Sequence, residues 1–122
     1  MRHDLSLEAL GDLLELPIVS TLATYRRDGT VLLSPVWHAW DGSGFLVCAG
    51  ASDVKVRHLR RDPRVSLVVY DQQPPYRGLE IRGVADLSTQ ADYRGIERRI
   101  AIRYLGEQAG TAYAERATES AR

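Results

Sequence analysis

The amino-acid sequence predicts a mainly β protein of the α+β class, an antiparallel barrel with flanking helices. Five segments show the alternating or continuous apolar pattern of β-strands. The turns at residues 26–29 and 41–44 are short and contain glycine, which is typical of tight hairpins. Only one helix pattern lies between strands, whereas a doubly wound parallel sheet needs a helix after every strand.

The N-terminal part predicts a helix and then a hairpin. Leucines recur between residues 5 and 16 and indicate an amphipathic helix that ends near Pro17. A strand follows over residues 18–25, and its return strand covers residues 30–40. Because proline cannot donate to a central ladder, we expect a bulge or an edge kink at Ser34 and Pro35 in the return strand.

Three more strands and a C-terminal helix complete the predicted domain, which spans residues 1–122. The strands cover residues 44–48, 64–70 and 76–87. From about residue 90 a helix carries Ile100 and Tyr104 on its apolar face and ends at Gly106. Residues 107–122 are small and polar, so we expect a frayed tail there.

Composition restricts the classes of partner. The chain has 122 residues and no net formal charge, and no aromatic residue alternates with its basic ones, so we expect no nucleic-acid partner. No apolar run is long enough to span a bilayer, and the single cysteine, Cys48, fits a reducing compartment, so we expect a cytoplasmic protein without a membrane partner. One cysteine and three scattered histidines show no ligand spacing, so no metal site is expected.

The segment around Lys55 has the features of an anion site. Lys55 is the only lysine among 16 basic residues, and it follows a strand that ends in small residues. Ser52 or Asp53 is a good N-cap for a short helix that stops before Pro63. A helix start offers unpaired N–H groups to an anion, and Lys55 and Arg57 add positive charge in or near the first turn. The alternative is a solvated basic helix face.

The same motifs, taken in order, resemble a known family. They are Asp28 and Gly29 before a strand, residues 34–37, residues 44–47, the run from Lys55 to Val65, and residues 76–83. Together they resemble the pyridoxamine-5′-phosphate-oxidase-like split β-barrel proteins, whose fold is of the FMN-binding split-barrel type. The branch they are most similar to is that of the flavin/deazaflavin oxidoreductases that use coenzyme F420.

This resemblance implies a homodimer with the cofactor in a groove between subunits, and hydride transfer to a small organic substrate. It implies that the cofactor phosphate binds Lys55 and Arg57, and that the flavin-like ring lies along a strand of four residues, Ser34, Pro35, Val36 and Trp37. The ribityl chain would pass Ala49, Gly50 and Ser52, and a loop with Tyr76 and Arg77 would reach the partner's cofactor. Catalytic residues are not identified.

Several alternatives remain open at this stage. The cofactor is F420 or, as the second choice, FMN, since both carry a phosphate; Arg60, Arg61 and Arg64 could bind the acidic tail of F420. The chain could also store or carry a flavin, F420 or haem without turnover, or be an interaction protein that lost its cofactor. We expect His38, Trp40 and Cys48 to be structural. The family usually adds a last strand after the C-terminal helix, and nothing in residues 107–122 resembles one.

Overall fold

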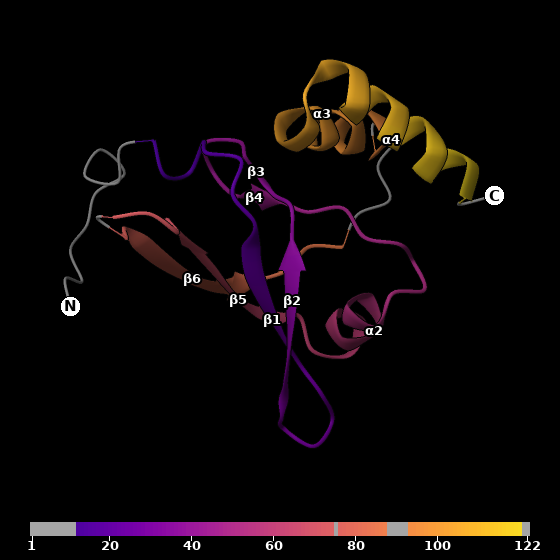
Figure 1. Ribbon diagram of the computed structural model, residues 1–122. Coiled ribbons are helices and arrows are strands. Elements are labelled where there is room, and N and C mark those ends of the chain that lie inside the picture. Colours follow the sequence, from indigo (N-terminus) through magenta and orange to yellow (C-terminus); the bar gives the residue numbers. More distant parts are fainter. Residues whose placement is uncertain (1–11, 75, 88–92, 121–122) are drawn as a thin grey trace.

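The computed structural model describes residues 12–74, 76–87 and 93–120 and consists of an antiparallel sheet with helices at its periphery (Figure 1). The main sheet has four strands in the order β2-β1-β5-β6, and β3 and β4 form a separate two-stranded sheet. The fold class is thus confirmed. The strands are β1 (Ser20–Tyr25), β2 (Val31–Val36), β3 (Ala39–Trp40), β4 (Phe45–Leu46), β5 (Arg64–Tyr70) and β6 (Gly78–Val84). The helices are α2 (Val54–Arg61), α3 (Tyr93–Leu105) and α4 (Glu107–Ser120).

One apolar cluster holds the sheet together. Alternate residues of β1 and β5, among them Leu22, Leu67 and Val69, point inward and are buried. Leu13 and Leu14 cover them from a turn in which the N–H groups of residues 15 and 16 donate to the Asp12 carbonyl. The leucines at 13 and 14 therefore contribute to the core from a turn and not from the expected helix. Residues 5–11 of that helix lie outside the described residues.

The expected kink at Ser34 and Pro35 is wrong in position. Pro35 lies inside β2 and pairs with Thr21. It is tolerated because β2 is an edge strand, where one row of N–H groups needs no ladder partner. The strand breaks two residues later, at Trp37 and His38, where the His38 N–H donates to the Tyr104 hydroxyl instead of to a neighbouring strand.

Two strands are shorter than expected. β4 contains only two residues, and Val47 and Cys48 leave the small sheet toward α2. β6 begins at Gly78, because Tyr76 has a left-handed backbone with φ of 57° and cannot extend the strand. The boundaries of β5 agree with the prediction, and so does the start of α2, which Asp53 caps.

Residues 107–120 form helix α4 and not the frayed tail that we expected. Gly106, with φ of 88°, ends α3 and reverses the chain. Gly110 then lets the two helices pack very closely: a Cβ atom there would lie 2.4 Å from the Ile102 Cα. Small residues that look unstructured in the sequence therefore form the contact surface of a helical hairpin. No strand follows α3 in the described residues 93–120.

Candidate functional site

A pocket of about 250 Å³ lies where the edge strand β2, helix α2 and the C-terminal hairpin meet. It contains four of the residues expected at the cofactor site, Pro35, Val36, Trp37 and Lys55. The other four lining residues are Cys48, Glu97, Ile100 and Tyr113. The pocket thus combines one cation, one carboxylate, two aromatic rings and several apolar groups.

Lys55 enters this pocket from the first turn of α2. Its Nζ lies 2.6 Å from Oδ2 of Asp53, and its backbone N–H donates to Oδ1 of the same carboxylate at 3.0 Å. The hydrogen bond from the Lys55 side chain lowers the pKa of Asp53, so the carboxylate is charged at neutral pH. Because only 16% of the Lys55 side chain is exposed, its ammonium group is held near the pocket wall.

Helix α2 is fixed to the sheet on its other side. His58 Nδ1 lies 3.0 Å from the hydroxyl of Thr24, which is fully buried in β1. Arg61 donates to the Tyr25 carbonyl at the end of the same strand. These two contacts, three residues apart on α2, fix the position of the helix and therefore of Lys55 relative to the sheet.

The aromatic wall of the pocket is centred on Trp37. Its ring stacks on Tyr104 of α3, with centroids 5.1 Å apart and planes 10° apart. Tyr113 of α4 contacts the same indole at 5.1 Å with a tilt of 49°. Tyr104 is fixed by a hydrogen bond to the Ile18 carbonyl, while Tyr113 is partly exposed. Trp37 is therefore held firmly by one ring and loosely by the other.

The remaining expected residues do not line this pocket. Arg57 is exposed on α2, Gly50 and Ser52 are exposed before that helix, and Ala49 and Ser34 are half-buried. Tyr76 and Arg77 lie in the β5–β6 loop, at the far side of the sheet from α2 (Figure 1). There Arg77 forms ion pairs with Asp71 at 2.7 Å and with Asp12 at 3.0 Å.

Four lining residues were missed by the sequence reasoning. Cys48 was expected in the core, but it is a half-buried wall residue whose pKa rises to about 11 through burial and the nearby Glu97, so it is a neutral thiol. Ile100 was predicted on the apolar face of the C-terminal helix, but it was not expected to line the cofactor site. Glu97 and Tyr113 gave no local signal, although the alanines and glutamates after Gly106 favour a second helix.

His38 lies outside the pocket, in the core, where it is fully buried. Its Nδ1 is 2.9 Å from the Ser20 hydroxyl and 3.1 Å from the Tyr104 hydroxyl. Both hydroxyls can donate to main-chain carbonyls and accept from Nδ1, so we assign the proton of the neutral ring to Nδ1. Burial, together with the nearby Arg103, lowers the pKa of His38 to about 4, so the ring is neutral.

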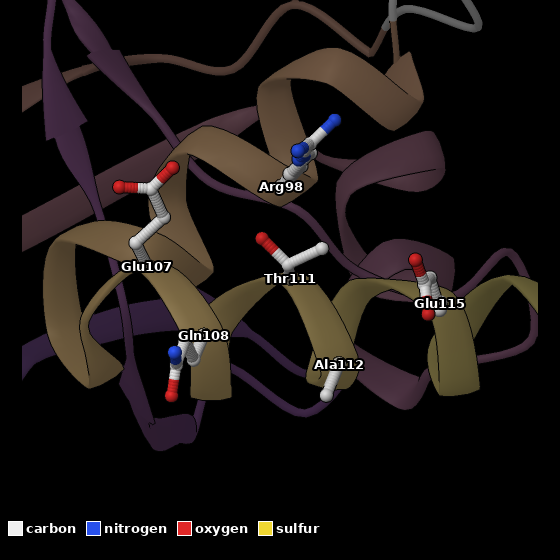
Figure 2. Close-up of a pocket in the computed structure, with 6 residues that line it drawn as sticks. All are labelled: Arg98, Glu107, Gln108, Thr111, Ala112 and Glu115. Carbon is white, nitrogen blue, oxygen red and sulfur yellow. The ribbon is translucent and has the colours of Figure 1, made fainter.

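A second, larger depression of about 550 Å³ lies on the C-terminal hairpin (Figure 2). Arg98 of α3 and five residues of α4 line it: Glu107, Gln108, Thr111, Ala112 and Glu115. It shares no lining residue with the Lys55 pocket and has no aromatic wall. A planar ring would find little to stack on there, so we take the Lys55 pocket as the candidate site.

Comparison with known proteins identifies the family. The model of the pyridoxamine 5′-phosphate oxidase family matches residues 6–121. The chain belongs to this family. A search of curated proteins finds no match to the chain. In the described residues, none of the helices has the length and apolar character required to traverse a bilayer.

Solved structures that resemble this chain include different kinds of protein. A conserved hypothetical protein from Mycobacterium tuberculosis is 25% identical, with a TM-score of 0.78 over 93% of this chain and 74% of its own. An F420 reductase is 30% identical, with a TM-score of 0.71 over 82% of this chain and 83% of its own. The haem storage protein HutZ from Vibrio cholerae, at 17% identity and a TM-score of 0.64 over 83% of this chain and 76% of its own, shares the fold.

Proposed function

We propose that this protein is an F420-dependent oxidoreductase that acts on a small organic substrate. The proposal rests on one observation. Lys55, at the N-terminus of α2, lines the same pocket as Pro35, Val36 and Trp37. A phosphate at the α2 end would meet an ammonium group and the positive end of the helix dipole. A planar ring at the other end would meet a strand edge and aromatic side chains.

The residues present fit the two chemical ends of such a cofactor. A pocket of about 250 Å³ holds only part of a tricyclic ring with its phosphate chain. The remainder of the cofactor therefore needs a second protein surface. We propose that a second copy of the chain supplies it in a homodimer. Exposed apolar residues on the sheet, Val31, Leu33 and Val84, support this part of the proposal, because a monomer leaves them in water.

The chain's own residues would act by position and not by covalent chemistry. F420, when bound, supplies hydride transfer. Lys55 would anchor the phosphate, Trp37 and Val36 would cover the ring, and Ile100 with Tyr113 would exclude water from the C-terminal side. The Cys48 thiol, with its raised pKa, is a poor nucleophile and would serve as a neutral wall.

The choice of F420 rests on the F420 reductase, which is 30% identical over 82% of this chain. FMN is the second candidate, because the family model that matches is that of pyridoxamine 5′-phosphate oxidase. Of the arginines expected to meet an F420 tail, Arg64 is paired with Asp62 and Arg61 is bonded to Tyr25. Arg60 is exposed and is the better candidate for that role.

A cofactor titration tests the proposal. Purified protein is titrated with F420 and with FMN by fluorescence, using wild type, Lys55→Ala and Arg26→Ala. Lys55→Ala should weaken binding by about tenfold or more, because it removes a charge-assisted contact to phosphate. Arg26→Ala, which removes an exposed cation of the β1–β2 hairpin, should bind as wild type does.

Turnover is tested separately from binding. Reduced cofactor should be oxidised by the protein when a suitable small acceptor is present, and a carrier protein would bind it without turnover. If the wild type binds neither F420 nor FMN at micromolar concentration, the proposed function is wrong. If Lys55→Ala binds as well as the wild type, the phosphate site lies elsewhere.

A further inference from the structure

We propose that Asp53 is an internal competitor of the ligand's phosphate and sets the affinity of the Lys55 site. The proposal rests on the proposed function and adds a residue that opposes binding. The carboxylate of Asp53 occupies the same two donors that a bound phosphate would use, the ammonium group and the backbone N–H of Lys55. A phosphate must therefore displace this carboxylate or share Lys55 with it.

The geometry makes this competition direct. Oδ2 of Asp53 is 2.6 Å from the Lys55 Nζ, and Oδ1 is 3.0 Å from the Lys55 N. The carboxylate thus lies at the N-terminus of α2, where an anion is most favoured. Asp53 is the last residue before the helix, so it is tethered at this position and its effective concentration is high.

Charge adds to the steric overlap. The carboxylate of Asp53 stays ionised at neutral pH because Lys55 lowers its pKa, so it would repel a phosphate dianion. Glu97 lines the same pocket and contributes a second carboxylate. Lys55 therefore faces Asp53 beside it and Glu97 in the pocket wall, so its charge is already balanced in the absence of ligand.

Exposure indicates which partner would move. The side chain of Asp53 is 35% exposed and that of Lys55 only 16%. Asp53 can rotate its carboxylate into water and regain hydration, while Lys55 stays at the pocket wall. We expect the bound state to keep Lys55 in place and to turn Asp53 outward.

The chain contains a matched pair at the other end of α2. Asp62 accepts from the Arg64 backbone N–H at 3.2 Å and from the Arg64 guanidinium at 2.7 Å, the same residue spacing and bonding pattern as Asp53 and Lys55. Neither Asp62 nor Arg64 lines the Lys55 pocket. Asp62→Asn therefore removes the same charge from a similarly spaced pair outside the pocket.

The test compares Asp53→Asn with Asp62→Asn. Asparagine is as good an N-cap as aspartate, so α2 should keep its start, and Asp53→Ser provides a second capping variant. Each protein is titrated with F420, FMN and riboflavin, which lacks the phosphate, and inorganic phosphate is tested as a competitor. Asp53→Asn should bind the phosphorylated ligands roughly fivefold more tightly, the scale of one partly exposed charge interaction. Its affinity for riboflavin, and the affinities of Asp62→Asn for FMN and riboflavin, which lack the acidic tail, should equal those of the wild type.

The outcomes separate this inference from the proposed function. If the wild type binds FMN or F420 and both Asp53 variants bind equally or more weakly, Asp53 positions Lys55 and the inference is overturned while the proposed function stands. An equal gain for riboflavin would also overturn it, because the effect would not involve phosphate. If neither wild type nor variant binds any of these ligands, both proposals fail.

Discussion

Protonation of His38 should control the stability of this protein between neutral and mildly acidic pH. The ring is fully buried, and its Nδ1–H is bonded to the hydroxyls of Ser20 and Tyr104. Its Nε2 is buried and has no hydrogen-bond partner among the described residues. A proton added to Nε2 would create a buried charge near Arg103 with no acceptor, so the folded state resists it.

The size of the effect follows from the shift in pKa. The folded-state pKa is about 4, below the ordinary histidine value of 6.5, so the unfolded chain binds the proton first as pH falls. The stabilisation is complete above pH 6.5 and is lost progressively as pH falls toward 4. Linkage gives a loss of about 2 kcal/mol between pH 7.5 and pH 5 and about 3 kcal/mol by pH 4. The carboxylates with lowered pKa values titrate below this window.

Urea unfolding at pH 7.5 and pH 5 measures the effect in wild type and in His38→Asn. Asparagine keeps an N–H donor at the Nδ1 position but does not ionise. The wild type should lose about 2 kcal/mol more than the variant over this interval. Equal losses in the two proteins would mean that His38 is already solvated or finds a partner when charged, and the account of a dry, unpartnered Nε2 would be refuted.

Three further outcomes are expected. Gly110→Ala should lower the free energy of unfolding in urea by about 1–3 kcal/mol, because its Cβ would overlap Ile102 and separate α3 from α4. Gly95→Ala, in the open part of α3, should raise the free energy of unfolding by up to ~1 kcal/mol. Tyr113→Ala should weaken the binding of F420, FMN and riboflavin alike by about three- to tenfold in fluorescence titrations, since it removes a ring contact. Lys55→Ala should leave riboflavin binding unchanged. An unchanged affinity in Tyr113→Ala would exclude α4 from the site. Sedimentation should give a dimer at micromolar concentration, and a stable monomer would refute the interfacial site.

The parts of the fold that local sequence signals determine were predicted well. Strand β5 starts directly after Pro63, and α2 starts at Asp53, because a proline and a capping side chain fix these boundaries within a few residues. Helix α4 was missed for the opposite reason. Its alanines and glutamates favour a helix, but Gly110 and two threonines interrupt that signal. The fit of Gly110 and Ala114 against α3 is a tertiary contact that no local pattern encodes.

The residues of the candidate site also fall into those with a local sequence signal and those without one. Lys55 was found because a lone lysine at a capped helix start is a local signal, and Trp37 followed from its place in a recognisable strand. Glu97 and Tyr113 reach the pocket through the packing of two C-terminal helices, so their roles depend on tertiary contacts. Tyr76 and Arg77 do not line the pocket of their own chain, and their expected role at a partner's site stays a prediction.

The two ends of the pocket differ in how firmly they are held, and this difference bears on specificity. At the end that we propose for the phosphate, α2 is fixed to β1 through Thr24 and Tyr25, so Lys55 presents its charge from a rigid support. At the ring end, Tyr113 is held mainly by its tilted contact with Trp37, and its ring is partly exposed. A phosphate common to several cofactors would thus be recognised by the rigid end. Discrimination between rings would fall to α4, the segment in which this chain departs from the last strand expected of its family.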